Sequence, residues 1–111
     1  MRNAKDELLG ILAEYNLVIK AAKIVNGDEE FDEPEDVKIY LLPEGYSGVE
    51  YKSFLQSLDF LYDNGWGGQE LFGLVWLTDG TWLARGEYDG SEWWEHRKCP
   101  EIPDYLKGDA K

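Results

Sequence analysis

Two Asp-Gly pairs, at 79–80 and 89–90, are the sequence feature that most restricts the fold. Each pair separates runs rich in aromatic and aliphatic residues, and Asp-Gly between such runs is a strong signal for a two-residue type I′ hairpin turn. Two of these turns in succession predict a three-stranded antiparallel meander over residues 69–98.

Counting outward from each turn fixes which residues face each other across the strands. In this register Trp93 lies beside Gly73 and Gly86, where the absent side chains leave room for an indole ring. Its face of the sheet is then apolar enough to be the core face, with Leu71, Val75, Leu77, Trp82, Ala84 and Tyr88.

Trp94 points to the opposite face, which is predicted to carry an aromatic strip edged with charge. The members of this face are Phe72, Leu74, Trp76, Leu83, Arg85, Glu87, Glu92, Trp94 and His96. A sheet covered on one side is expected to be polar on the other, and this one is not. Two explanations remain open: another segment, such as the C-terminal "CPEIPDYL", folds over the strip, or the strip is a dimer or partner interface.

The remaining chain predicts two helices and a first pair of strands. Asn3 caps a helix over 4–15, and Ser47 with Glu50 forms a capping box for a helix over 48–63. Residues 16–26 and 37–43 are typical of strands. We therefore expect a single α+β domain over 1–111, in the order α-β-β-α-β-β-β, with an antiparallel sheet and both helices on one face.

Charge restricts the class of partner. The chain has 23 acidic and 11 basic residues, a formal net charge of −12. Direct binding of nucleic acid or of an anionic membrane is therefore not expected, and a basic protein or nucleoprotein partner is. We also expect a cytoplasmic protein without a secretion signal or membrane span, because the N-terminal stretch is charged and no run of about 18 apolar residues occurs.

The residues that usually carry chemistry are few. One Cys (Cys99) and one His (His96) form neither an internal disulfide nor a zinc set, and no cofactor motif is present. His96 with Glu87 and Glu92 resembles an acid-base or metal trio, but carboxylates are so numerous here that chance explains it. We expect no catalytic residue, no metal and no cofactor.

An acidic run, "DEEFDEPED" at 28–36, has two interpretations. It lacks the glycine and the terminal glutamate of a calcium loop. It is either a solvated loop or a polyanion that imitates nucleic-acid phosphate and binds a Lys/Arg groove. The carboxylates concerned are Asp28, Glu29, Glu30, Asp32, Glu33, Glu35 and Asp36. The partner-binding residues that we predict are these seven together with Phe72, Trp76, Arg85, Glu87, Glu92 and Trp94.

The C-terminal third, with "DGTW" and "EYDGSEWW", resembles small acidic proteins encoded by bacteriophages and prophages. That resemblance implies a non-enzymatic inhibitor of a host defence complex, such as an anti-CRISPR protein, acting in the host cytoplasm on a nucleic-acid-handling complex. The alternative is a homo-oligomeric phage structural or accessory protein that assembles, as a homodimer for example, through the aromatic strip.

Overall fold

The structure is a computed structural model that describes residues 1–28, 32–63 and 68–106. It contains two α-helices, α1 (Ala4–Tyr15) and α2 (Gly48–Ser57). A two-stranded sheet pairs β1 (Arg2–Asn3) with β4 (Leu61–Tyr62). The main sheet consists of β2 (Ile19–Asn26), β3 (Lys38–Leu42), β5 (Leu71–Leu77), β6 (Trp82–Tyr88) and β7 (Ser91–Arg97). Short 3₁₀ turns lie at Pro34–Asp36 and Asp104–Leu106.

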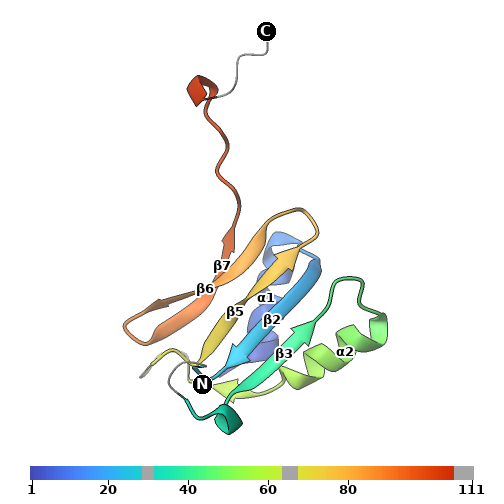
Figure 1. The fold of residues 1–111 in the computed structure, drawn as a ribbon, viewed down its shortest axis with the longest axis vertical. Coiled ribbons are helices and arrows are strands. Elements are labelled where there is room, and N and C mark those ends of the chain that lie inside the picture. The colour runs from blue at the N-terminus through green and yellow to red at the C-terminus, as the bar shows by residue number, and fades with distance from the viewer. Residues whose placement is uncertain (29–31, 64–67, 107–111) are drawn as a thin grey trace.

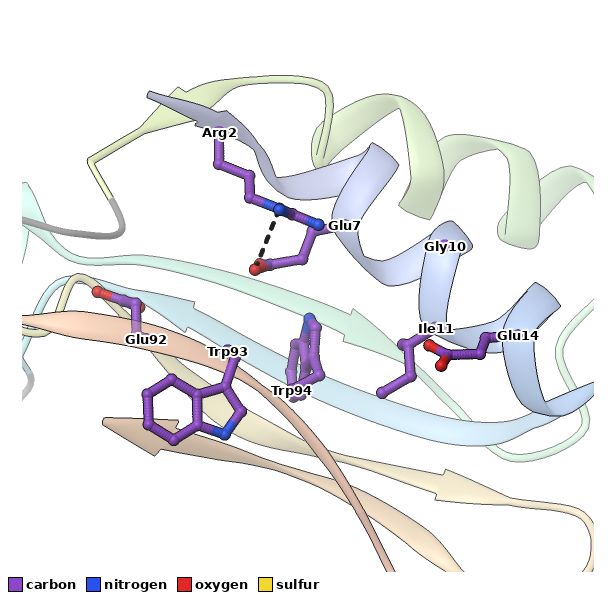
Figure 2. A pocket seen from close by; sticks show the side chains of 8 residues that line it. All are labelled: Arg2, Glu7, Gly10, Ile11, Glu14, Glu92, Trp93 and Trp94. Atoms are coloured by element: carbon purple, nitrogen blue, oxygen red, sulfur yellow. Dashed lines mark ion pairs between the residues drawn. The ribbon is translucent and has the colours of Figure 1, made fainter. Parts of the chain in front are cut away.

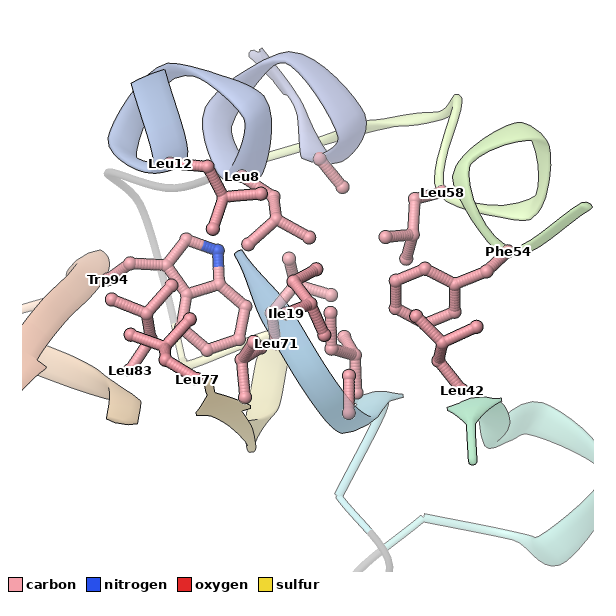
Figure 3. Packing of buried hydrophobic residues seen from close by; sticks show 14 of the residues in the cluster. Leu8, Leu12, Ile19, Leu42, Phe54, Leu58, Leu71, Leu77, Leu83 and Trp94 are labelled. Atoms are coloured by element: carbon pink, nitrogen blue, oxygen red, sulfur yellow. The ribbon is translucent and has the colours of Figure 1, made fainter. Parts of the chain in front are cut away.

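The main sheet is antiparallel throughout, in the order β3-β2-β5-β6-β7. In Figure 1 α1 lies behind the sheet and α2 lies beside β3, and Figure 3 shows both helices over the same face of the sheet. The predicted α+β class, element order and one-sided placement of the helices are confirmed. No helix among the described residues is long and apolar enough to span a membrane.

Side-chain caps define where both helices begin. The Asn3 side chain accepts a hydrogen bond from the backbone N–H of Asp6 at 3.0 Å, as predicted. At α2 the Glu50 N–H donates to Ser47 Oγ at 3.1 Å, and the Ser47 N–H donates to Glu50 Oε1 at 2.9 Å. This is the reciprocal capping box that the sequence predicts.

The core lies between the helices and one face of the main sheet, which we call the inner face. Figure 3 shows Leu8 and Leu12 of α1 and Phe54 and Leu58 of the α2 region above it. The Trp94 indole lies under α1. The inner-face partners of these side chains are Ile19, Ala22, Ile24, Leu42, Leu71, Val75, Leu77, Leu83 and Trp94.

The prediction that the second helix continues to residue 63 is wrong. α2 ends at Ser57, and the chain then binds the N-terminal segment: Lys5 N–H donates to the Leu58 carbonyl and Ala4 N–H to the Phe60 carbonyl, both at 2.9 Å. Leu61 and Tyr62 pair with β1. The helical spacing of the apolar residues continues past Ser57, but pairing with a segment more than 50 positions away overrides it.

The two Asp-Gly turns differ in type, which the sequence does not reveal. Asp89 and Gly90 both have positive φ, 52° and 87°, as a type I′ turn requires. At the other turn only Gly80 has positive φ (86°), and Leu77 N–H donates to the Thr81 carbonyl at 3.0 Å. The β5–β6 loop therefore has three residues, Thr78 to Gly80, a geometry in which a left-handed residue follows a type I turn.

This one-residue difference shifts the β5–β6 register and reverses the predicted faces of β6 and β7. Val75 pairs with Leu83 rather than Ala84, whereas the β6–β7 register, with Gly86 opposite Trp93 and Arg85 opposite Trp94, is confirmed. The tryptophans do lie on opposite faces, but Trp94 is the core residue and Trp93 lies on the other face. Trp93 lies over Gly86 as predicted, but not beside Gly73.

Candidate binding surfaces

The face of the main sheet that the helices leave uncovered, here called the outer face, is strongly apolar. Cross-strand pairing places the following side chains on it: Val25, Ile39, Leu41, Phe72, Leu74, Trp76, Trp82 and Trp93. Trp76 is 45% exposed, Trp93 38% and Leu74 39%. Large contiguous apolar surface of this kind marks binding sites on soluble proteins.

Trp76 separates two hollows on the outer face. One, of about 200 Å³, lies over β2 and β5 and is lined by Lys23, Val25, Phe72, Gly73, Leu74 and Trp76. The other, of about 360 Å³, is lined by Lys20, Ala21, Glu44 and Trp76. Lys20 Nζ lies 3.1 Å from Glu44 Oε2. The Trp76 side chain therefore lies between the two hollows, and each hollow has a lysine beside it.

The predicted aromatic strip is only partly correct. Phe72 and Trp76 lie on the outer face, with Phe72 half-buried, and Trp82 and Trp93 join them there. Arg85, Glu92 and Trp94, also among the residues predicted to bind a partner, were placed on this strip, and that placement is wrong because their side chains are buried on the inner face. The three-residue β5–β6 loop is the cause, since it places Leu83 and Arg85 on the same face as Val75.

Arg85 is the centre of a buried ion-pair network. Its Nη1 lies 3.0 Å from Glu7 Oε1, and its Nη2 lies 2.8 Å from Glu92 Oε1 and 3.0 Å from the Tyr62 hydroxyl. Tyr62 donates a short hydrogen bond to Glu7. The guanidinium also stacks over the Trp94 ring, with Cζ 4.7 Å from the ring centroid. Arg85 Nε is buried and has no hydrogen-bond partner among the described residues.

The backbone anchors the second carboxylate of this network. Glu92 accepts from the N–H groups of Glu70 at 2.7 Å and Leu71 at 2.9 Å, where the chain enters β5. Arg2 Nε lies 3.4 Å from Glu7 Oε2 at the surface. The network therefore joins α1, β4, β5, β6 and β7, which is a structural role.

The network shifts the ionisation of two members. Burial raises the pKa of Tyr62, as does its hydrogen bond to Glu7, and these effects outweigh the opposing charge of Arg85. Burial alone would lower the pKa of Arg85, but the negative charge of Glu7 and hydrogen bonds to Glu92 and Tyr62 raise it above the ordinary value. Tyr62 therefore stays neutral and Arg85 charged at all physiological pH values.

A pocket of about 470 Å³ opens beside this network, between α1 and β7. Figure 2 shows Glu7 and Glu14 of α1 on one side and the indoles of Trp93 and Trp94 projecting apart on the other. Gly10 also lines the pocket, and a Cβ at this position would meet no atom within 4 Å. Glu7 is paired with Arg2 and Arg85, and Glu92 with Arg85, so the pocket presents Glu14 as its one carboxylate without a partner among the described residues.

Carboxylates gather at one edge of the main sheet, here called the acidic edge. Asn26 pairs with both Lys38 and Leu71, so the β2–β3 connection and the entry to β5 lie together, and the β6–β7 turn lies at the same edge. Asp32, Glu33, Glu35 and Asp36 are exposed there, Asp28 is half-buried, and Glu87 is exposed near the β6–β7 turn. Glu29 and Glu30, also predicted to bind a partner, lie outside the described residues.

Some of these carboxylates accept hydrogen bonds from backbone N–H groups of their own loop. Asp32 Oδ2 accepts from the Asp28 N–H at 2.6 Å, and Glu87 Oε2 accepts from the Gly90 N–H at 2.9 Å. Glu33, Glu35 and Asp36 make no side-chain bond to any described residue. These last three are therefore the carboxylates most available to a partner.

His96 and Cys99 lie in different environments. His96 Nε2 lies 2.8 Å from Thr81 Oγ1, and its ring packs against Tyr15, with centroids 5.1 Å apart. Cys99 is exposed. Glu92 is bound to Arg85, so the imagined trio of His96, Glu87 and Glu92 does not assemble. Among the described residues no group of three or more His, Cys, Asp or Glu side chains is placed to hold a metal ion.

Comparisons with protein-family models, with curated proteins and with solved structures gave no match to this chain.

Proposed function

We propose that the protein is a non-enzymatic binding protein that attaches to a basic protein of a host nucleic-acid-handling complex and blocks it. The observation that carries this proposal is the uncovered outer face, with Leu74, Trp76 and Trp93 each more than a third exposed. Trp is the residue most enriched among interface hot spots, and exposed apolar surface of this extent favours protein binding.

The acidic edge supports the basic character of the partner. Its exposed carboxylates attract a Lys/Arg-rich surface at long range, which speeds association more than it strengthens the final complex. The outer face then anchors the complex through apolar contact. The resemblance to small acidic phage proteins is consistent with a partner that normally binds nucleic acid, because such a partner has a basic groove to occupy.

The test uses the full chain as bait against a bacterial host lysate, beside three variants. Trp76→Ala removes the anchor, Glu33→Gln with Glu35→Gln and Asp36→Asn neutralises the acidic edge, and Val49→Ala is the control. Val49 is 75% exposed on α2; it lines a hollow with Ile39 and Leu41 at the β3 margin of the outer face, but neither of the hollows beside Trp76. Captured proteins are identified by mass spectrometry, and binding of the purified partner is then measured by interferometry at several salt concentrations.

We expect a basic partner that duplex DNA displaces. Trp76→Ala should weaken its binding by about 2 kcal/mol or more, mainly through faster dissociation. The edge variant should slow association and reduce its salt dependence. A partner that binds wild type and Trp76→Ala equally, or one that DNA does not displace, would refute the proposal.

A homo-oligomeric assembly protein is the second candidate, because an uncovered aromatic sheet face also suits a second copy of the chain. Sedimentation over a wide range of protein concentration tests it. A monomer at every concentration would exclude this candidate and leave the first untouched.

A further inference from the structure

Residues 98–106 form a projecting segment with apolar side chains in solvent. Figure 1 shows the chain leaving β7 and running away from the sheet before the 3₁₀ turn at Asp104–Leu106. Ile102 is 60% exposed, Tyr105 85% and Leu106 64%. Every described residue from Arg97 onward is exposed, so no part of the described fold covers these side chains.

The sequence of this segment keeps it extended. Pro100 and Pro103 fix their own φ angles and favour extended backbone at the residues before them. The turn that follows is closed by one bond, from the Leu106 N–H to the Pro103 carbonyl at 2.9 Å. A preorganised segment of this kind loses little conformational entropy on docking.

The chemistry of the segment matches the hollows around Trp76. The segment alternates apolar side chains with the carboxylates of Glu101 and Asp104, and the chain as a whole is strongly acidic. On the outer face Lys23 lies beside one hollow, which is otherwise lined by apolar residues, and Lys20, ion-paired with Glu44, lies beside the other. An acidic, apolar segment is therefore complementary to this face in both charge and hydrophobicity.

We propose that the 98–106 segment of one copy docks on the outer face of a second copy, with Ile102 and Tyr105 in the hollows on either side of Trp76. The inference rests on the proposed role of the outer face as a binding surface, and it names a second occupant of that surface, which competes there with the basic partner. The segment runs away from its own sheet, so it would have to turn back to reach its own outer face. Exchange between two copies lets each segment reach an outer face without such a turn. Reciprocal exchange closes at a dimer, since each copy then gives one segment and receives one.

The experiment uses complementary variants of the full chain. Ile102→Ser with Tyr105→Ser disables the segment, Trp76→Ser disables the face, and Val49→Ser is the exposed apolar control. Sedimentation velocity and light scattering give the mass of each variant alone and of an equimolar mixture of the first two. All the substituted side chains are exposed or partly exposed, and circular dichroism checks that each variant stays folded.

The wild type and Val49→Ser should dimerise, and each disabling variant alone should associate about thirtyfold or more weakly, as expected for loss of a hot-spot side chain. Mixing them should restore a heterodimer, because one intact segment then meets one intact face. A monomeric wild type, including one whose segment folds onto its own sheet, overturns the inference. A dimer that survives the segment variant, or a mixture that forms no heterodimer, also overturns it. Loss of dimerisation with retained capture of a basic partner would leave the proposed function standing.

Discussion

Replacing Arg85 by Met should nearly unfold the protein, although a surface arginine would tolerate this change. The Arg85 side chain is 2% exposed, and Glu7 and Glu92, its two carboxylate partners, are 7% and 0% exposed. Met has a similar length, so it leaves little cavity, but it leaves Glu92 without its cation and Glu7 with only Arg2, whose side chain is 54% exposed. Breaking a buried ion pair in this way costs about 3–5 kcal/mol. That is a large part of the roughly 5–15 kcal/mol that holds an ordinary domain folded.

The same reasoning predicts a rescue. Adding Glu7→Gln and Glu92→Gln to Arg85→Met removes the unpaired charges and keeps an acceptor for Tyr62 and for one of the two N–H groups, of Glu70 and Leu71, that Glu92 binds. The triple variant should recover part of the lost stability, because the buried charges are gone but the other N–H group loses its acceptor. Arg85→Lys keeps the charge but loses the two-pronged geometry, and we expect it to be intermediate.

Urea unfolding, followed by tryptophan fluorescence and near-UV circular dichroism, measures these free energies. A free energy of unfolding for Arg85→Met within about 1 kcal/mol of the wild type would contradict this prediction, since the network would then contribute no more than a surface pair. A triple variant that is no more stable than Arg85→Met would also contradict it. In that case packing against Trp94, not charge, would be the contribution of Arg85.

Three further predictions follow from single contacts. Because the folded-state pKa of Tyr62 is raised, the unfolded chain loses the Tyr62 proton first, so the free energy of unfolding should fall as pH rises above about 10. In unfolding experiments at pH 9 to 11, Tyr62→Phe should lose less stability with rising pH than the wild type does. Gly86→Val should destabilise by about 1–3 kcal/mol through overpacking, because a Cβ there would lie 2.6 Å from Trp93 Nε1 and 2.4 Å from Glu95 Oε1; Gly86→Ala should cost less, and equal costs in thermal melts would contradict this reason. Ser47→Ala should cost about 0.5–2 kcal/mol through loss of the capping box; no change in the melting temperature would show that α2 begins without it.

The sequence predicts those elements whose signals are local. The caps of both helices involve residues three positions apart, and the type I′ turn at Asp89-Gly90 fixes the β6–β7 register by itself. Asp79-Gly80 carries the same dipeptide but forms a different loop. There the Asp79 side chain accepts from the Thr81 N–H at 2.9 Å and from its hydroxyl, a local bond consistent with the three-residue loop.

The candidate site is harder to predict because its burial is decided by distant partners. Arg85 meets Glu7, 78 positions away, and Tyr62, 23 positions away. No spacing in the sequence links these residues, so a charged side chain in a strand is naturally assigned to the surface. One signal was available: Arg85 lies two positions after Leu83 in the same strand, so both side chains lie on one face of the sheet, and Leu83 is fully buried.

The sequence of β5 alone does not determine which face of the sheet the helices cover. In β5 both alternating sets are apolar, with Leu71, Val75 and Leu77 in one and Phe72, Leu74 and Trp76 in the other. Period-two patterning therefore cannot say which set the helices cover, and neighbouring strands decide. β2 offers Ala22 and Ile24 on one face but Lys23 on the other, so covering the Lys23 face would bury an ammonium group, at considerable cost. The helices cover the face without that lysine, and the aromatic face with Trp76 is left uncovered.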